Sequence, residues 1–324
     1  MGDSGPSGHI AVIGCGSIGA GWAALFAAHG HTTRVYDPNP SAETFLHTIV
    51  SEAVRVLHQL GHFNSSPSSN HLKDVSARIT FTMNLSSTLQ DATFVQENGP
   101  EDLATKTDLL RALDATLDAS IPILTSTSGL TCSSMQSFLT NHPSRFAIGH
   151  PFNPPHLIPL VEIVGGSQTS HSTLEHAKSF YTSLGRKPIV LKHEIPGHIA
   201  NRLQSALLRE ILYLMKEDIA RIDDIETAME FGPGLRWGVM GPSLLMHLGG
   251  GLGGAAYYAE KLLGPLLTWN APDTLVVDDE LRKKWVAQTI DVVGNETYIS
   301  LSRKRDAGIV NTLKWRQSLP ETQE

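Results

Sequence analysis

Cysteine is scarce in this sequence, with only Cys15 and Cys132 among 324 residues. Two cysteines cannot build a disulfide framework, so the composition fits a reducing compartment. No uninterrupted apolar run reaches the roughly 18 residues that would span a bilayer, and we expect no association with a membrane. Residues Met1–Gly8 contain no basic stretch followed by an apolar core, so we expect no signal peptide and a cytoplasmic protein.

Positive charge is also in short supply. The chain has 25 lysines and arginines against 32 aspartates and glutamates, which gives a formal net charge of -7. A nucleic-acid-binding protein normally carries a basic stripe that neutralises phosphates, so we expect no nucleic-acid partner. The 15 histidines show no H-E-x-x-H or similar spacing, and we predict no metal site. What remains is a mildly acidic protein that we expect to be soluble and intracellular.

Short apolar runs alternate with helical patterns between residues 9 and 194, as in a parallel sheet covered by helices. Most of these runs are rich in Val and Ile, which is typical of strands buried on both faces. The candidate strands are Ile10–Ile13, Arg34–Tyr36, Arg78–Thr82, Thr93–Gln96, Ile121–Thr125, Phe146–Ile148, Leu160–Val164 and Ile189–Leu191. The candidate helices between them include Ser41–Gln59, Ala104–Leu117 and Ser172–Leu184, and the Ser-rich insert Asn64–Asn70 is predicted to be a surface loop.

The pattern changes at Ile195-Pro196-Gly197, after which strand-like alternation nearly disappears. The predicted helices that follow are Ile199–Lys216, Ile222–Phe231, Ala255–Leu263, Asp279–Val293 and Glu296–Arg316. Four of the five tryptophans fall in this half, which concentrates aromatic anchors for packing or self-association there. We therefore predict two domains, an α/β domain over residues 1–194 and an all-helical domain over residues 195–324.

A glycine-rich turn, Gly14-Cys15-Gly16-Ser17-Ile18-Gly19, directly follows the candidate strand HIAVI and precedes an apolar helix. Strand before and helix after make a G-x-G-x-x-G pattern informative. Gly14 permits the tight turn, Gly16 lets the backbone approach a pyrophosphate, and Gly19 allows the helix to pack closely on the strand. The helix N-terminus at Ser17 and Ile18 offers unpaired N–H groups to the anion. The pattern predicts a doubly wound sheet of Rossmann type that binds a dinucleotide.

The next candidate strand ends at Asp37, and this residue indicates which dinucleotide binds. An acidic side chain there accepts hydrogen bonds from the adenosine ribose and repels a 2′-phosphate, which favours NAD over NADP. FAD is possible on the glycine motif alone, but the helical half lacks the second α/β domain of a flavoprotein. A glycine turn without any ligand is the other alternative. The second glycine run, Gly249–Gly254, has no Lys-Ser/Thr after it and is interpreted as a turn between helices.

Chemically reactive side chains concentrate between residues 126 and 201. Ser128 follows a candidate strand, and hydroxyl groups at strand ends of an open α/β sheet face the ligand crevice. Oxidation of a secondary alcohol needs a group that takes the hydroxyl proton, and His150 suits that work. A carboxylate such as Glu162 on its far nitrogen would fix the tautomer. The alternatives are a histidine in an ordinary turn, a serine that caps a helix, and, at Asn201, an amide on a helix face.

Five segments together resemble the 3-hydroxyacyl-CoA dehydrogenase family over nearly the whole chain: GCGSIGAGWA, VQENGPED, STSG, GHPFNPPHLIPLVEIV and GHIANRLQ. The resemblance implies an NAD-dependent dehydrogenase that interconverts a 3-hydroxy acid and its 3-oxo acid. It also implies that His150 is the general base in oxidation and that Glu162 orients it. Ser128 and Asn201 would hydrogen-bond the reacting oxygen, as in an oxyanion site.

The same resemblance places Glu97 and Lys106 near the nicotinamide half of NAD. It also implies that the helical domain binds substrate and forms a homodimer. Two positions depart from the family pattern: Ser126 stands where acyl-CoA enzymes usually carry Asn, and His198 stands where they carry an aromatic residue. Both concern the surroundings of the substrate, so they question the substrate rather than the reaction.

The segments GPGLRWGVMGP and MHLGGGLGG are most similar to a branch of short enzymes that act on free hydroxy acids, carnitine-like or gulonate-like. Arg236, beside Trp237, is a candidate partner for the substrate carboxylate. A quaternary ammonium would be held over aromatic faces, and the candidates are Phe231, Trp237, Tyr257, Tyr258 and Trp269. These aromatics could instead fill the helical core or a dimer interface. The alternatives for the whole chain are a 3-hydroxyacyl-CoA dehydrogenase acting on a CoA thioester and a non-catalytic, crystallin-like NAD-binding protein.

Overall fold

The computed structural model describes residues 8–63 and 70–319. The segment Met1–Ser7 and all of the predicted Ser-rich loop except Asn70 lie outside the described residues. The chain divides into two compact units, Met1–Asn201 and Arg202–Glu324. None of the described helices is both long and apolar enough to cross a bilayer.

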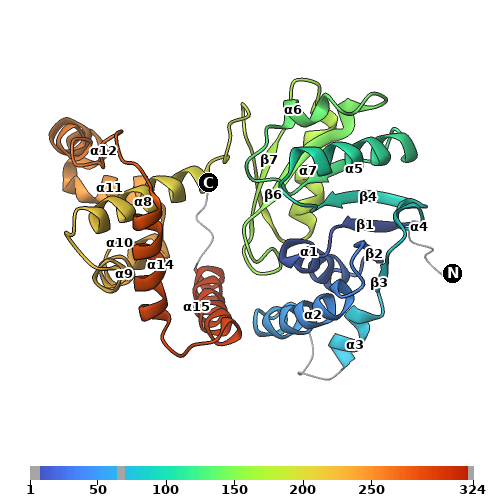
Figure 1. Ribbon diagram of the computed structural model, residues 1–324, viewed down its shortest axis with the longest axis horizontal. Helices are drawn as coiled ribbons and strands as arrows, with labels where there is room; N and C mark the ends of the chain where they lie inside the picture. Colours follow the sequence, from blue (N-terminus) through green and yellow to red (C-terminus); the bar gives the residue numbers. More distant parts are fainter. Residues whose placement is uncertain (1–7, 64–69, 320–324) are drawn as a thin grey trace. The chain divides into compact units, whose positions relative to one another are not determined.

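The first unit contains one sheet with the strand order β3-β2-β1-β4-β5-β6-β7-β8 (Figure 1). The strands are β1 (His9–Ile13), β2 (Thr33–Tyr36), β3 (Ile79–Thr82), β4 (Ala92–Glu97), β5 (Ile123–Thr125), β6 (Phe146–Pro151), β7 (Leu160–Val164) and β8 (Lys187–Val190). Neighbouring strands are parallel except for β6 and β7. The predicted doubly wound sheet is confirmed, and the chain order reverses between β1 and β4. The carboxyl ends of these two strands therefore border the place where such sheets bind ligands.

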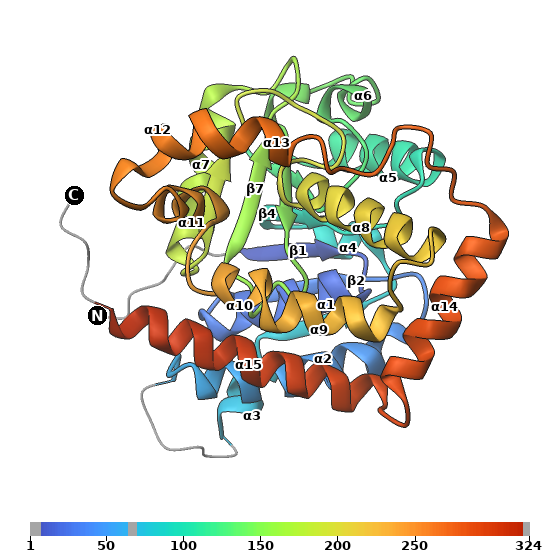
Figure 2. The ribbon, with the colours of Figure 1, turned by 90° about the vertical axis from the view of Figure 1, so that its left-hand side faces the viewer.

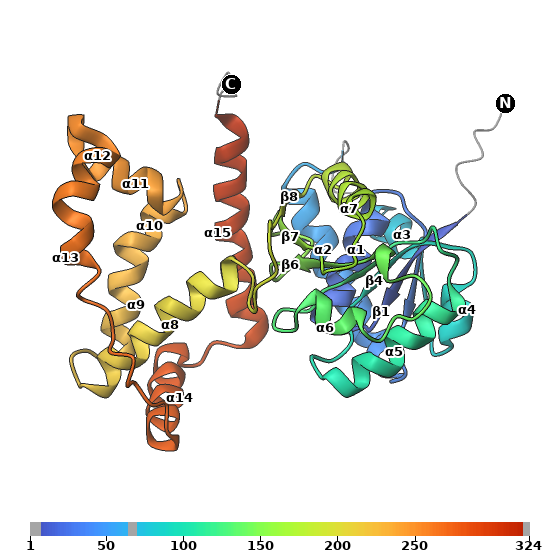
Figure 3. The ribbon, with the colours of Figure 1, turned by 90° about the horizontal axis from the view of Figure 1, so that it is seen from above.

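Helices cover both faces of this sheet. They are α1 (Ser17–Ala28), α2 (Ala42–Gln59), α3 (Asn70–Ser76), α4 (Leu85–Leu89), α5 (Leu103–Thr116), α6 (Cys132–Gln136) and α7 (His171–Ser183), with a 3₁₀ turn at Pro143–Arg145. On one face, Ile10 and Val12 of β1 join a buried cluster with residues of α1, α2 and α7. On the other, Ala11 and Ile13 join a cluster with residues of α5 and α6. Figure 3 shows α5 and α6 on one side of the sheet and α7 on the other. Successive residues of β1 thus point into two separate cores, which explains why its sequence is apolar throughout.

The second unit contains only helices among its described residues, and Figure 2 shows its long helices α8, α9, α14 and α15. The helices are α8 (Ala200–Lys216), α9 (Ile222–Phe231), α10 (Pro233–Trp237), α11 (Pro242–Gly249), α12 (Gly254–Tyr258), a π-helix (Ala259–Leu263), α13 (Gly264–Leu266), α14 (Asp279–Val293) and α15 (Tyr298–Ser318). The first two residues of α8 belong to the first unit. The predicted all-helical half is confirmed.

The sequence analysis missed α10 and α11, because Pro and Gly interrupt the pattern on which a helix prediction depends. The glycine run that follows them is a turn between helices, as predicted. Gly249 ends α11, a 3₁₀ turn occupies Gly251–Gly253, and Gly254 begins α12. Gly251 and Gly254 have φ of 58° and 57°, a region that glycine enters without steric cost.

Candidate active site

The turn between β1 and α1 can be built only with glycine at two positions. Gly14 has φ of 89°, and a Cβ there would lie 2.7 Å from the carbonyl oxygen of Asn98. A Cβ on Gly19 would overlap the carbonyl oxygen of Gly14. At Gly16 a Cβ would meet nothing within 4 Å, so the backbone is open on that side. These are the close turn, the close helix packing and the open approach that a pyrophosphate-binding loop needs.

The N-terminus of α1 is free to bind an anion. Gly16 is the N-cap, no side chain of residues 8–63 or 70–319 caps the helix, and its first turn contains no acidic residue. Gly16 and Ser17 are exposed, and Ile18 is half-buried. The unpaired N–H groups of this turn and the helix dipole both favour negative charge.

Asp37 lies directly beside this turn. Its Oδ2 accepts a hydrogen bond from the Cys15 N–H at 2.8 Å, and its Oδ1 accepts one from the Asn39 N–H at 2.9 Å. A carboxylate has about four acceptor positions, so it can still bind hydroxyl groups. The residues present therefore fit the adenosine ribose and the pyrophosphate of NAD.

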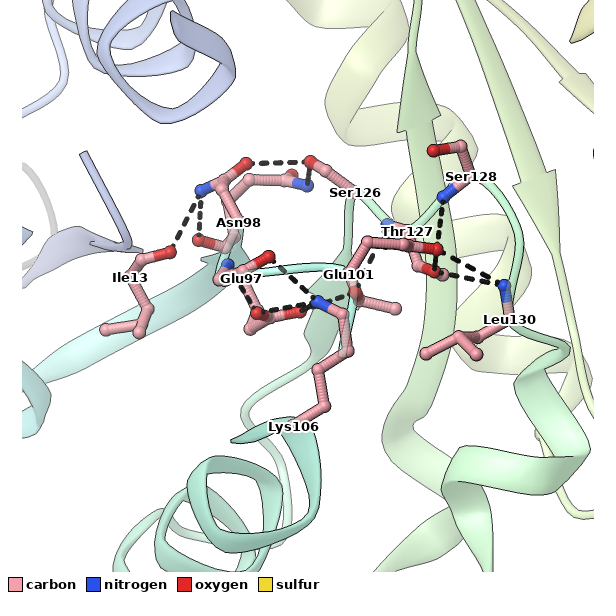
Figure 4. A network of polar contacts seen from close by, with 12 residues as sticks. Ile13, Glu97, Asn98, Glu101, Lys106, Ser126, Thr127, Ser128 and Leu130 are labelled. Carbon is pink, nitrogen blue, oxygen red and sulfur yellow. Dashed lines mark hydrogen bonds and ion pairs between the residues drawn. The ribbon is translucent and has the colours of Figure 1, made fainter. Parts of the chain in front are cut away.

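Glu97 and Lys106 form a buried ion pair. Lys106 Nζ lies 2.8 Å from Oε2 and 3.0 Å from Oε1 of Glu97, and the two side chains are 1% and 0% exposed. Thr125 Oγ1 and the Gly99 N–H also donate to the Glu97 carboxylate, each at 2.5 Å. Figure 4 shows how this pair joins the end of β4 to α5. Both side chains are engaged inside the domain, and their contact with a cofactor stays a prediction.

His150 and Glu162 are cross-strand partners. They face each other in the antiparallel register of β6 and β7. His150 Nδ1 lies 3.0 Å from Glu162 Oε2, and the side chains are 7% and 0% exposed. Because a carboxylate only accepts hydrogen bonds, Nδ1 carries the proton and donates it to Glu162. In the neutral ring, Nε2 is then left with a lone pair, as a general base requires.

The second oxygen of Glu162 holds the start of α8. Oε1 accepts hydrogen bonds from the N–H groups of Ile199 at 2.8 Å and Ala200 at 3.1 Å. Asn201 lies in the first turn of this helix, and its Nδ2 is 3.5 Å from His150 Nε2. Burial raises the pKa of the Glu162 carboxyl, but hydrogen bonds from His150, Ala200 and Ile199 outweigh it and lower the pKa below its usual value. A charged Glu162 therefore holds His150 and Asn201 together.

The two serines after β5 have different surroundings. Ser126 Oγ donates to Asn98 Oδ1 at 2.7 Å (Figure 4). It accepts from Trp22 Nε1 at 3.2 Å and from Gln96 Nε2 at 3.0 Å. The hydroxyl of Ser128 is half-buried and has no hydrogen-bond partner in residues 8–63 and 70–319. Ser126 is thus used inside the domain, whereas Ser128 is available to a ligand.

His198 lies between the segment Ser126–Ser128 and His150. The sequence analysis missed this link. The Nε2 of His198 lies 3.1 Å from the carbonyl oxygen of Thr127, and its ring centroid is 4.9 Å from that of His150. His150, Glu162 and Asn201 are thus in direct contact, and Ser128 is reached through His198 and Thr127. The only sequence signal was that a histidine replaces the family's aromatic residue at this position.

The candidate substrate residues of the second unit are accessible. Arg236 and Trp237 lie on α10, and both are exposed. Phe231, Tyr257 and Trp269 are also exposed, at 72%, 50% and 69%, whereas Tyr258 is half-buried. The role of these side chains stays a prediction. No group of three or more His, Cys, Asp or Glu able to hold a metal ion occurs in the part of the chain that the structure describes.

Comparison with known proteins agrees with this geometry. Residues 9–195 match the family of the 3-hydroxyacyl-CoA dehydrogenase NAD binding domain, and residues 197–291 match its C-terminal domain. An L-carnitine dehydrogenase of Streptomyces griseus is 39% identical over 317 residues, which cover 97% of this chain and 92% of that protein. A 3-hydroxyacyl-CoA dehydrogenase of Gibberella moniliformis is 35% identical over 96% of this chain and 90% of its own length.

A solved structure is similar over almost the whole chain. It is that of 5-formyl-3-hydroxy-2-methylpyridine 4-carboxylic acid 5-dehydrogenase, an NAD+ dependent dismutase. The TM-score is 0.82 at 26% identity, and the match covers 96% of this chain and 99% of that one. The two family matches together span most of the chain, from β1 to α14. The chain therefore belongs to the 3-hydroxyacyl-CoA dehydrogenase family and is an NAD-dependent dehydrogenase.

Proposed function

We propose that this enzyme oxidises a small free 3-hydroxy acid of carnitine-like structure to the 3-oxo acid, reversibly. The observation that carries the proposal is the contact of His150 with both Glu162 and Asn201. The similarity to an L-carnitine dehydrogenase over 97% of the chain supports a free acid as substrate. A CoA thioester is less well supported, because the chain is acidic overall, with a net charge of -7, and a CoA substrate favours a basic surface.

In oxidation, His150 Nε2 accepts the proton of the substrate hydroxyl. Glu162 keeps the proton on Nδ1 and stabilises the imidazolium that forms. The Asn201 amide and the Ser128 hydroxyl donate hydrogen bonds to the reacting oxygen and stabilise its partial negative charge. Bound NAD supplies the acceptor for the hydride that leaves the carbon bearing this hydroxyl. In reduction, the imidazolium of His150 returns its proton to the oxygen.

The cofactor roles follow from the turn described above. Gly14, Gly16 and Gly19 allow the pyrophosphate to approach the first turn of α1, where Ser17 and Ile18 offer their N–H groups. Asp37 would bind the adenosine ribose and exclude a 2′-phosphate. Glu97 and Lys106 would act near the nicotinamide by holding the β4–α5 connection in place.

We assign the binding of the substrate's carboxylate and of its quaternary ammonium to residues of the second unit. The guanidinium of Arg236 has no hydrogen-bond or ion-pair partner in the described chain and would bind the carboxylate. The exposed aromatic faces of Trp237 and Tyr257 would hold a quaternary ammonium. An Arg236→Ala variant should raise the KM for the acid more than it lowers kcat.

We further propose a cytoplasmic homodimer formed through the helical unit. Large apolar side chains of this unit are exposed in the single chain, and Leu235, Leu244 and Ile290 are each at least 60% exposed. Exposed apolar surface on this scale is typical of an interface. The two cysteines are free, which suits a reducing compartment. Light scattering during gel filtration should give twice the mass of one chain.

The decisive experiment follows the formation of NADH from NAD, and of NADPH from NADP, with L-carnitine, L-gulonate, L-3-hydroxybutyrate and 3-hydroxybutyryl-CoA. The proposal predicts turnover of L-carnitine or a close analogue with NAD. Activity confined to the CoA ester would contradict the free-acid assignment. Binding of NAD without turnover of any of the four would contradict the carnitine-like substrate.

A further inference from the structure

The loop Thr127–Leu130, called the serine loop below, carries a Ser128 side chain that makes no hydrogen bond of its own within the described residues. The position of the Ser128 hydroxyl is therefore set by what holds the backbone around it. Two side chains from distant parts of the first unit do so, Glu101 after β4 and His198 before α8.

Glu101 binds the N–H side of the serine loop with one oxygen. Its Oε1 accepts from the backbone N–H of Ser128 at 3.2 Å, Gly129 at 2.8 Å and Leu130 at 3.3 Å, and from Thr127 Oγ1 at 2.5 Å. Figure 4 shows these contacts converging on the carboxylate, with the Ser128 hydroxyl pointing away from it. Burial raises the pKa of Glu101, but the bonds from Thr127 and Gly129 lower it below its usual value. Glu101 is thus a charged acceptor, and its two shortest bonds, from Thr127 Oγ1 and the Gly129 N–H, have the lengths of charge-assisted hydrogen bonds.

His198 binds the carbonyl side of the same loop. A carbonyl oxygen only accepts, so Nε2 of His198 donates to Thr127 O at 3.1 Å, and the neutral ring has its lone pair on Nδ1. Nδ1 is buried without a hydrogen-bond partner in the described residues. The residue has φ of 51°, a conformation that is uncommon outside glycine. His198 is only 1% exposed, so the packed surroundings hold its backbone in this uncommon conformation.

The segment that contains His198 also holds Glu162. The next two residues, Ile199 and Ala200, donate their N–H groups to Glu162 Oε1, whose carboxylate binds His150. One short stretch of backbone therefore links the serine loop to the His150–Glu162 pair. A phenylalanine at position 198 would fill the space of the ring but could not donate to Thr127.

We infer that Glu101 and His198 are positioning residues, which together fix the serine loop so that the Ser128 hydroxyl meets the oxygen that exchanges its proton with His150. The inference rests on the proposed function for the role of Ser128. Its structural part, that Glu101 and His198 hold the loop, stands apart from any substrate.

The kinetic test is a set of double-mutant cycles that combine Ser128→Ala with Glu101→Gln and with His198→Phe. Each single variant should lower kcat by about 10- to 100-fold, because a misplaced group loses most of its effect. The KM for NAD should stay within about twofold. Each double variant should be only slightly slower than its slower parent, since Ser128 no longer acts once its loop is free. The matched controls are Asp108→Asn, an exposed carboxylate on α5, and His193→Phe, an exposed histidine of the same connection as His198.

Hydrogen exchange of the free protein supplies the readout that needs no substrate. The amides of Ser128, Gly129 and Leu130 should exchange at least about tenfold faster in Glu101→Gln than in the parent and in Asp108→Asn. Nitrogen NMR of the parent should show His198 as the neutral Nε2–H form at neutral pH.

If the decreases in kcat of the single variants multiply fully in both double variants, the positioning role is overturned. Unchanged amide exchange of the serine loop in Glu101→Gln would overturn the loop assignment. If the parent turns over none of the four compounds in the panel but the exchange differences appear, the proposed substrate fails while the loop assignment holds.

Discussion

His150 and Glu162 face each other across the antiparallel pair β6–β7, with Nδ1 of the histidine 3.0 Å from Oε2 of the glutamate. The same carboxylate receives the first N–H groups of α8 on its other oxygen. One buried charge thus sets the tautomer of the histidine and holds the start of α8, whose first turn contains Asn201. The proposed chemistry and the local fold therefore involve the same side chain.

Replacing Glu162 by Gln should separate these two effects. Loss of the charge should lower kcat by about 10³-fold or more, as when the carboxylate partner of a catalytic histidine is neutralised. Unfolding in urea should show a loss of about 1–3 kcal/mol, because the N–H groups of Ile199 and Ala200 lose a charged acceptor. The exposed Glu175→Gln on α7 is the control. A kcat within twofold of the parent would contradict the orienting role of Glu162.

The lowered pKa values of Glu101 and Glu162 predict how stability depends on pH. A carboxyl whose pKa is lower in the folded than in the unfolded chain stabilises the fold above the unfolded value, and this contribution disappears as the pH falls through the folded value. The free energy of unfolding should therefore decrease as the pH drops below the ordinary value of 4.5. Urea midpoints measured between about pH 3 and pH 7 should show a shallower decrease in Glu162→Gln. Identical profiles would mean that Glu162 has the same pKa in both states.

Asp37→Ala tests the choice of cofactor. The variant should bind NAD about tenfold more weakly, since hydrogen bonds to a charged group are lost, and should bind NADP no worse than the parent. Fluorescence titration of both reduced cofactors measures the ratio of their dissociation constants. Asp74→Ala, on the exposed face of α3, should leave the ratio unchanged. An unaltered ratio in Asp37→Ala would refute its role at the ribose.

The Glu97–Lys106 pair should matter mainly for stability. Lys106→Met leaves the Glu97 charge buried without its cation, which should cost about 3–5 kcal/mol. The double variant Glu97→Leu with Lys106→Met should recover much of this loss. Arg111→Met, which breaks an exposed pair with Asp108 on the same helix, should cost less than about 1 kcal/mol. Thermal unfolding measures the loss of stability in each variant. An equal loss in Lys106→Met and Arg111→Met would contradict the burial argument.

The sequence predicted the strands of the sheet well, because buried parallel strands are short Val- and Ile-rich runs between helices. It also predicted that His150 and Glu162 could form a pair, since both lie in distinctive motifs, and the structure places the two side chains in contact. It could not predict that they are cross-strand partners, because β6 and β7 are the one antiparallel pair among the described strands and its register depends on the whole sheet.

The roles of Glu101 and His198 escaped the sequence for a different reason. Both side chains bind backbone N–H or C=O groups, which every residue has, so no side-chain pattern marks their partners. Glu101 lies within the VQENGPED motif, yet its spacing from Ser128 does not indicate contact. The use of Ser126 as an internal hydrogen-bond partner likewise depends on Trp22 and Gln96, which come from other elements.

The most direct test of the account is the His150→Ala variant, measured for both NAD binding and NADH formation with the acid that the parent turns over. General base catalysis contributes about 10²–10⁴-fold, so kcat should fall by that factor while the dissociation constant for NAD stays within about twofold. That result would place the proton transfer on His150. Turnover equal to that of the parent, with NAD bound normally, would show that another group takes the proton and would contradict the proposed mechanism.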